Sequence, residues 1–190
     1  MSEQLTKIAV SGDLGSGKST VCKLLLAKLP GFRLYSMGEA WRKLAEERGM
    51  TILELNQYSE THPLDEEMDR RMAEIGQGPE PIIFDSRLAW HFVPHSLKVH
   101  LTVDPEVAAE RIFNDRRRGD AEEYASIGEA LQKIRDRKES EKARYLQKYG
   151  IDNTDLGNYD LVVDTSAQSP EEIAGIIVAA FQEGSRRLKD

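Results

Sequence analysis

Short apolar, β-prone runs alternate with helical patterns along this chain. The five runs are KIAVS at 7–11, FRLYS at 32–36, PIIFD at 81–85, LKVHLTV at 97–103 and DLVVD at 160–164. They are continuously apolar rather than alternating, which is typical of parallel strands buried on both faces. Strands that alternate with helices predict a parallel sheet covered by helices. We therefore expect an α/β fold with a five-stranded parallel sheet and helices on both faces.

Capping patterns mark three of the predicted helix starts. They are Thr51 with Glu54, Asp104 with Pro105 and Glu106, and Ser169 with Pro170 and Glu172. Each pairs a side chain that accepts hydrogen bonds from free backbone N–H groups with an acidic residue or a proline in the first turn. The last helix is expected to run from about 170 to 182, with the tail GSRRLKD frayed.

Two connections are longer than one crossover helix needs. About 45 residues separate the second strand from the third, and they carry helical patterns at roughly 38–48, 51–60 and 64–75. Nearly 60 residues separate the fourth strand from the fifth. Both are expected to be insertions beyond the core, where lids and specificity elements are carried.

Length and composition narrow the class of protein. A chain of 190 residues with 39% hydrophobic and 31% charged residues predicts one soluble domain spanning 1–190. No apolar run approaches the roughly 20 residues that span a bilayer, and the N-terminus lacks a secretory pattern, so a cytoplasmic protein without a membrane partner is expected. A net charge of -7 argues against nucleic acid as a partner. A monomer is expected, and Cys22, the only cysteine, is expected to be buried and inert.

The strongest motif follows the first strand. Gly12, Asp13, Leu14, Gly15, Ser16, Gly17, Lys18 and Ser19 fit the Walker A pattern between a strand and an apolar-periodic helix. Backbone N–H groups of such a loop turn inward around phosphate oxygens, and the helix adds the positive end of its dipole. We expect ATP here, with Lys18 on the β- and γ-phosphates and the Ser19 hydroxyl on Mg²⁺. A glycine-rich turn that binds nothing is the competing interpretation.

A second residue that holds Mg²⁺, an acidic one, is expected at the end of a buried strand. Asp85 ends the third strand, as the Walker B acid of such folds does, and would hold Mg²⁺ through water. The alternative is an acidic residue that caps the following turn. Asp104 also ends a strand, but Pro105 and Glu106 identify it as a helix cap.

Separated arginines suggest that the phosphoryl group is transferred to a second anion. Arginine forks match phosphate oxygens, and candidates follow the second and third strands at Arg42 and Arg87. Arg137, Glu141 and Arg144 share one face of a predicted helix, with Glu141 between two guanidinium groups. Ion pairs on a solvated helix are the alternative for this last group.

Taken together, these motifs resemble the nucleoside monophosphate kinases, and most closely the short, archaeal-type cytidylate kinases. The resemblance covers nearly the full length. It rests on the order and spacing of the Walker A loop, SMGEAWRKLAEERGM, FDSRLAWHFVP, AERI, RKESEKARYLQKYGID, and YDLVVDTS followed by SPEEI. It implies the P-loop NTPase fold, with an acceptor-binding insertion at about 36–80 and a lid at about 112–148.

The resemblance also implies roles for individual residues. Ser36, Gly38 and Arg42 would line the acceptor site, and Arg87 would bind the acceptor phosphate with Arg42. Arg137 and Arg144 would close over both phosphates from the lid, with Glu141 orienting an arginine or the base. Arg111 would pack on the adenine of ATP, whose phosphates also meet Thr20. One of Arg116, Arg117 and Arg118 would be a further lid arginine, and the sequence does not single it out.

The expected reaction is transfer of the γ-phosphoryl group of ATP to a nucleoside monophosphate, CMP or dCMP first, with Lys18, Arg87, Arg137 and Arg144 as catalytic residues. The acceptor is already an oxyanion near neutral pH, so no general base is needed. Alternatives are a P-loop kinase of another nucleotide or small metabolite, and a non-catalytic ATP-binding switch.

Contacts to the base are not fixed by the sequence. Asp65 or Asp69, in the helical pattern of the first insertion, could face the base. Trp90 and Phe92 are expected to support the site from below rather than to pack beside the base. His91 and His95, four residues apart with Pro94 between them, are not expected to hold a metal.

Overall fold

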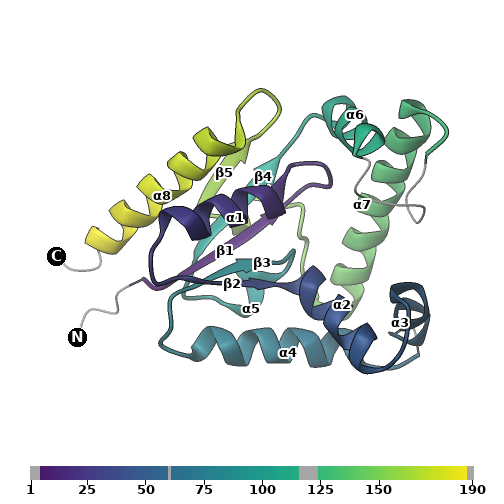
Figure 1. The fold of residues 1–190 in the computed structure, drawn as a ribbon, viewed down its shortest axis with the longest axis horizontal. Coiled ribbons are helices and arrows are strands. Elements are labelled where there is room, and N and C mark those ends of the chain that lie inside the picture. The colour runs from purple at the N-terminus through teal and green to yellow at the C-terminus, as the bar shows by residue number, and fades with distance from the viewer. Residues whose placement is uncertain (1–4, 60, 116–123, 188–190) are drawn as a thin grey trace.

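A five-stranded parallel sheet forms the centre of the protein (Figure 1). The computed structural model describes residues 5–59, 61–115 and 124–187. The strands are β1 (Lys7–Gly12), β2 (Arg33–Ser36), β3 (Ile82–Asp85), β4 (Leu97–Thr102) and β5 (Leu161–Asp164). Their order is β2-β3-β1-β4-β5, and every neighbouring pair is parallel. All five strands confirm the expectation from the sequence within one residue at each end.

Helices cover both faces of the sheet. On one face, α1 (Lys18–Lys28) packs against α8 (Pro170–Arg187) and the sheet. On the other face lie α4 (Leu64–Gln77) and α5 (Ala89–Phe92). Ile8 and Val10 of β1 belong to the core cluster that includes α1 and α8, whereas Ala9 belongs to the cluster of Met72 and Phe84. This is the period of two of a strand that is buried on both sides.

Burial on both faces holds for the inner strands only. Every residue of β1 and β3 is buried, but β2 and β5 are partly exposed along their length. The expectation of full burial was therefore wrong for these two strands. They lie at the edges of the sheet, where a neighbouring strand and part of the helical cover are missing on one side.

The predicted caps form. Thr51 and Glu54 exchange hydrogen bonds at the start of α3 (Ile52–Ser59), and Ser169 and Glu172 do so at α8. Asp104 accepts from two backbone N–H groups at the start of α6 (Pro105–Asn114). The predicted end of α8 was wrong, because the helix continues from 182 to Arg187. Gly184 lies within it, close to Leu5 near the N-terminus, so packing there supports a turn that the sequence pattern predicts to fray.

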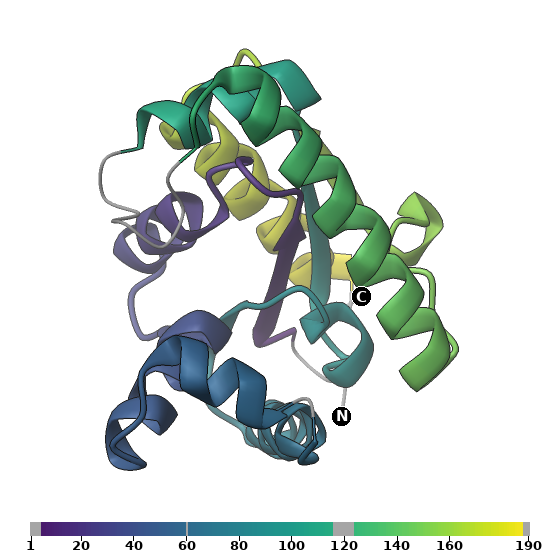
Figure 2. The ribbon, with the colours of Figure 1, turned by 90° about the vertical axis from the view of Figure 1, so that its right-hand side faces the viewer.

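Two helical groups stand beside the sheet at the ends of its strands (Figure 2). The first comprises α2 (Met37–Glu47), α3 and α4, and the second contains the 23-residue α7 (Ile127–Tyr149), which packs on α6. A short 3-10 helix, Leu156–Asn158, leads to β5. Cys22 is fully buried in the core, and burial raises the pKa of its thiol to about 12, which agrees with an inert residue.

Candidate active site

The Walker A loop joins β1 to α1 and lines a large cavity. Gly15 has φ 83° and Gly17 has φ 78°, a left-handed conformation that glycine adopts without strain. A Cβ on Gly15 would lie 2.9 Å from Ala108 on α6, so the loop also needs a glycine to pack there. Residues 12–20 all line a cavity of about 1170 Å³, which also includes Arg111. We call it the donor cavity.

Three side chains converge on Asp85, which is buried at the end of β3. The Ser19 hydroxyl donates to Asp85 Oδ2 at 2.8 Å, and Lys18 Nζ pairs with Oδ1. Ser36, which caps α2, lies with its Oγ 3.5 Å from Oδ2. A hydroxyl and a carboxylate side by side are hard oxygen ligands of the kind that Mg²⁺ prefers, so the residues present fit this ion.

The Lys18 side chain is largely shielded from solvent beside the cavity. Burial lowers its pKa to about 8, and the nearby Arg87 also lowers the pKa. A close anion favours the charged form of a buried lysine. Asp85 supplies that anion in this structure, and a phosphate in the donor cavity would be a second one.

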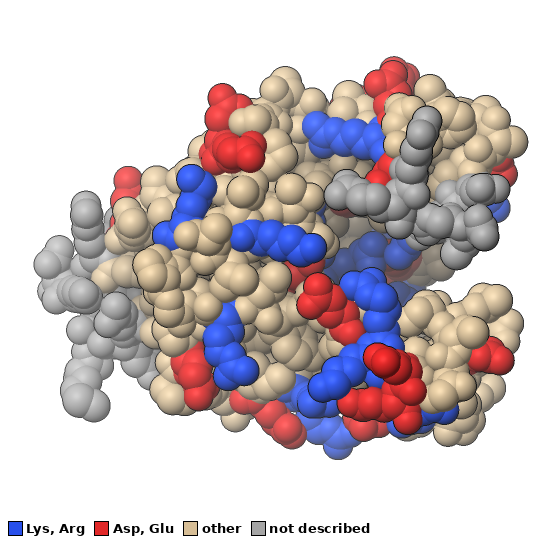
Figure 3. Space-filling view, viewed as in Figure 1, with Lys and Arg blue, Asp and Glu red and all other residues tan. Residues whose placement is uncertain are grey.

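A second cavity, of about 300 Å³, opens beside the first. It is lined by all of Ser36, Gly38, Arg42, Arg87 and Arg144, which the resemblance assigns to the acceptor. We call it the acceptor cavity. Lys18, Ser19, Arg42 and Arg87 line both cavities, so the two meet at two arginines and the P-loop lysine. Figure 3 shows Lys and Arg side chains gathered around a hollow on this face.

Glu141 pairs directly with two arginines, one at the expected helical spacing and one from another segment of the chain. Its carboxylate accepts from Arg137 Nε at 3.0 Å and from Arg87 Nε at 2.9 Å. Arg144, the other arginine expected beside Glu141, interacts with its charge at longer range than Arg137 does, and it lines the acceptor cavity and contacts Tyr145. Arg87 reaches Glu141 from the loop after β3, a tertiary contact that spacing within one helix does not reveal.

Arg137 and Glu141 do not line the acceptor cavity in this structure. They line a third cavity of about 200 Å³ between the P-loop, α6 and α7, together with Lys138. Lys138 Nζ pairs with Asp13 Oδ1 of the Walker A loop at 2.9 Å, so α7 is tied to that loop. Arg116, Arg117 and Arg118 lie outside the described residues.

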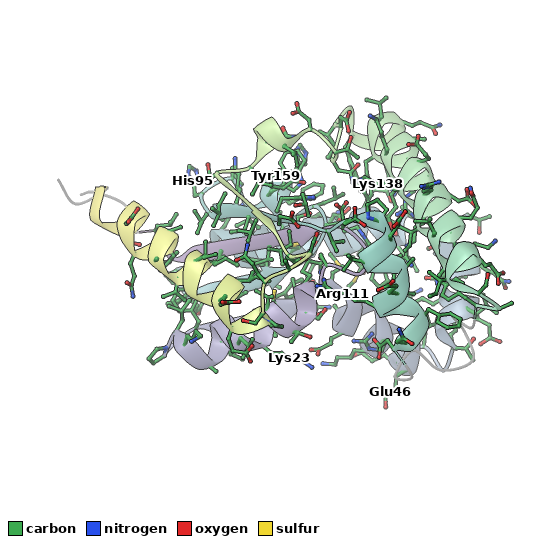
Figure 4. The ribbon with its side chains drawn as sticks, turned by 90° about the horizontal axis from the view of Figure 1, so that it is seen from above. Lys23, Glu46, His95, Arg111, Lys138 and Tyr159 are labelled. Carbon is green, nitrogen blue, oxygen red and sulfur yellow. The ribbon has the colours of Figure 1, made fainter. Side chains whose placement is uncertain are left out.

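Arg111 braces the donor cavity from α6 (Figure 4). Its guanidinium donates to the backbone oxygens of Gly15 at 3.3 Å, Thr165 at 2.7 Å and Ser166 at 3.3 Å. It therefore connects the P-loop to the turn between β5 and α8. Its place at the cavity wall is compatible with contact to a bound base, and its hydrogen bonds add an anchoring role that the sequence did not indicate.

Several lining residues of the acceptor cavity were missed from the sequence. They include Trp41 on α2, Met68 on α4, and Tyr145, Lys148 and Tyr149 on α7. Lys148 lies four positions after Arg144 and Tyr149 four positions after Tyr145, and this helical spacing was the available signal. Which side of a helix faces a cavity still depends on how it docks.

The aromatic residues after β3 support the site from below, as expected. Trp90 is buried against Tyr159, and Phe92 packs edge-on against Tyr149 at 5.3 Å, so neither lines the acceptor cavity. Among the described residues, no three His, Cys, Asp or Glu side chains form a metal-binding group.

Comparison with known proteins decides the family. The model of a family described as "AAA domain" matches residues 8–147. The cytidylate kinase of Pyrococcus abyssi is 41% identical over 92% of each chain. That of Pyrococcus furiosus is also 41% identical, over 96% of this chain and 95% of the relative, and that of Methanobrevibacter smithii is 36% identical over 92% and 98%. The chain belongs to the cytidylate kinase family.

Solved structures show the same P-loop kinase fold beyond the cytidylate kinase family. Shikimate kinase from Acinetobacter baumannii, solved with shikimate, matches with a TM-score of 0.63 at 17% identity, over 95% of this chain and 94% of that one. Shikimate kinase from Aquifex aeolicus matches with a TM-score of 0.60, over 94% and 98%. At this identity the likeness concerns the fold alone.

Among the helices of the described residues, none has the length and apolar character needed to cross a membrane.

Proposed function

We propose that this chain transfers the γ-phosphoryl group of ATP to CMP or dCMP, giving ADP and the nucleoside diphosphate. The observation that carries the proposal is the junction of the two cavities at Lys18, Arg42 and Arg87. Two anionic substrates that enter from either side would meet there, between cationic groups. A switch that only binds ATP has no need of the second cavity or of its arginines.

Catalysis would rest on position and charge. A phosphate oxygen of CMP attacks the γ-phosphorus, a new P–O bond forms, and the bond from the γ-phosphorus to the oxygen of ADP breaks. Arg42 and Arg87 would hold the acceptor phosphate in line, and Lys18 would neutralise charge on the transferring group. The attacking oxygen is already anionic near neutral pH, so no side chain has to remove a proton.

Ser19 and Asp85 would hold Mg²⁺. When bound, the ion neutralises charge on the β- and γ-phosphates. Lys18 would then leave Asp85 for the phosphates of ATP, and the Ser19 hydroxyl would leave it for the metal ion. The Ser36 hydroxyl, 3.5 Å from Asp85, would remain at the boundary with the acceptor cavity.

We further propose that the chain is one kinase domain with two working insertions. Residues of about 36–80 would hold the acceptor, and residues of about 112–148 would act as the lid. Arg137 and Arg144 would complete the phosphate contacts from α7, with Glu141 orienting arginines. Because Arg137 lines the third cavity, closing over the phosphates requires it to change position.

A coupled ADP-release assay tests the proposed function. The purified chain is given ATP and Mg²⁺ with CMP, dCMP, UMP, AMP or GMP, and with shikimate as an acceptor of another class. CMP and dCMP should stimulate ADP release most strongly. If no monophosphate raises the rate above that without acceptor, the proposal fails, and stimulation by shikimate alone would reassign the acceptor site.

A further inference from the structure

The acceptor cavity has a polar end on the side of α4. Asp65 and Asp69 reach it from α4, and Lys148 and Tyr149 reach it from the last turn of α7. Lys18, Asp85 and Arg87 line the same cavity near the P-loop. In Figure 2, α4 lies near the bottom of the view and the P-loop near the top, with the ends of the strands between them. A monophosphate held at Arg42 and Arg87 would therefore direct its base towards α4.

Asp69 is held in one orientation there. The Tyr149 hydroxyl donates to Asp69 Oδ2 at 2.6 Å, and the Tyr149 ring is fixed edge-on against Phe92. Within the described part of the chain, Oδ1 of Asp69 accepts no hydrogen bond. A half-buried carboxylate with one fixed and one open oxygen is a strong and directional acceptor.

Asp65 differs from Asp69 because its carboxylate forms an ion pair with a lysine. Lys148 Nζ lies 3.4 Å from Asp65 Oδ2 and 3.1 Å from a carboxylate oxygen of Glu66. These pairs tie the end of α7 to the start of α4. Asp65 therefore has a direct cationic partner, whereas the hydrogen-bond partner of Asp69 is a neutral hydroxyl and the Lys148 charge acts on Asp69 from further away.

Cytosine and uracil differ at one edge that such an acceptor can read. Cytosine carries an exocyclic amine where uracil carries a carbonyl oxygen. An ionised carboxylate accepts a hydrogen bond from the amine and repels the carbonyl. The walls of the cavity around this polar end include Trp41, Met68 and Tyr145, whose flat or apolar surfaces suit a base.

We propose that Asp69, oriented by Tyr149, accepts a hydrogen bond from the exocyclic amine of cytosine and thereby selects CMP over UMP. This inference rests on the proposed function, since it names the group that reads the base of the acceptor. Asp69 is the specificity-determining residue, and Tyr149 is a positioning residue that acts through it.

The decisive variant is Asp69→Asn. The Tyr149 hydroxyl would still donate to the side-chain oxygen, which places the amide NH₂ where Oδ1 was. That NH₂ donates to the carbonyl of uracil and opposes the amine of cytosine. We expect the ratio of kcat/KM for CMP to that for UMP to fall by about 5- to 150-fold, the range of one well-formed base contact. The change should lie mainly in KM, because the contact is remote from the reacting phosphates.

Two further variants accompany it. Glu67→Gln makes the same chemical change at an exposed position of α4 and should leave the CMP/UMP ratio unchanged. Tyr149→Phe removes the hydroxyl that orients Asp69 and should lower the ratio by a smaller factor. Melting temperatures of all variants are recorded, and if Asp69→Asn does not fold, Tyr149→Phe decides the question.

The outcomes separate the inference from the proposed function. A wild type that prefers CMP, with an unchanged preference in Asp69→Asn or, if that variant does not fold, in Tyr149→Phe, overturns the role of Asp69 and leaves the kinase activity standing. A wild type that uses CMP and UMP equally also overturns it. A wild type that phosphorylates no monophosphate overturns the proposed function itself.

Discussion

At the scale of single residues, the site is organised around carboxylates that hold cations. Asp85 holds Lys18, and Glu141 holds Arg87 and Arg137. Each carboxylate is better shielded from solvent than the cation beside it. A buried carboxylate without its partners is costly, so these pairs fix Lys18 and Arg87 at the meeting point of the two cavities.

Glu141→Gln tests this arrangement. The amide keeps the shape but loses the charge that holds two arginines, so Arg87 should be less well placed for the acceptor phosphate. We expect kcat/KM for CMP to fall by roughly 10- to 100-fold, the cost of one charged hydrogen-bond contact. Steady-state kinetics measures this, with Glu139→Gln at an exposed position of α7 as the matched control. Equal kinetics in the two variants would show that Glu141 does not place Arg87.

At the scale of elements, α6 packs against the P-loop. Gly15 meets Ala108 of α6, and Arg111 one turn later donates to the Gly15 carbonyl oxygen. Gly17 has a similar backbone conformation, but a Cβ placed on it would contact nothing within 4 Å. Substitutions at the two glycines therefore distinguish the cost of backbone strain, which both share, from the cost of steric crowding, which only Gly15 has.

Gly15→Ala and Gly17→Ala form a matched pair. Both variants should lose about 1 kcal/mol of stability from the left-handed backbone. Only Gly15→Ala should lose a further 1–3 kcal/mol, approximately, because its methyl group overlaps Ala108. Urea unfolding gives the two free energies. Equal destabilisation would mean that α6 yields to the methyl group and does not constrain the loop.

The sequence was sufficient for features that depend on local spacing. The five strands, three caps and the Walker A loop follow from patterns within a few residues of each other, and the structure has them. The sequence was insufficient for contacts that depend on how one helix packs against the rest of the molecule. Arg87 is a direct partner of Glu141, and Lys148 and Tyr149 face the acceptor cavity, because α7 packs where it does. The end of α8 was misplaced since Gly184 packs beside Leu5.

At the scale of the whole molecule, α7 connects the two substrate cavities. Lys138 ties it to Asp13 of the donor loop, and Tyr149 and Lys148 tie its end to α4 beside the acceptor cavity. We therefore expect a substrate that shifts α7 from one side to alter the contacts on the other side.

Binding of the two substrates should be coupled. We expect a non-hydrolysable ATP analogue to raise the affinity for CMP by about 5-fold or more, and CMP to raise the affinity for the analogue by the same factor. Isothermal titration calorimetry measures both. Lys138→Ala should reduce the coupling, whereas Lys133→Ala, at an exposed position of α7, should not. Independent binding in the wild type would contradict a linking role for α7.

The central claim is that a phosphoryl group passes between two cavities that meet at Lys18, Arg42 and Arg87. Following the label from γ-³²P-ATP in the presence of CMP tests it most directly. We predict that the label appears in the β-phosphate of CDP, and that Lys18→Ala lowers this rate by orders of magnitude while the protein stays folded. Label released only as inorganic phosphate, or transfer at the wild-type rate in Lys18→Ala, would contradict the claim.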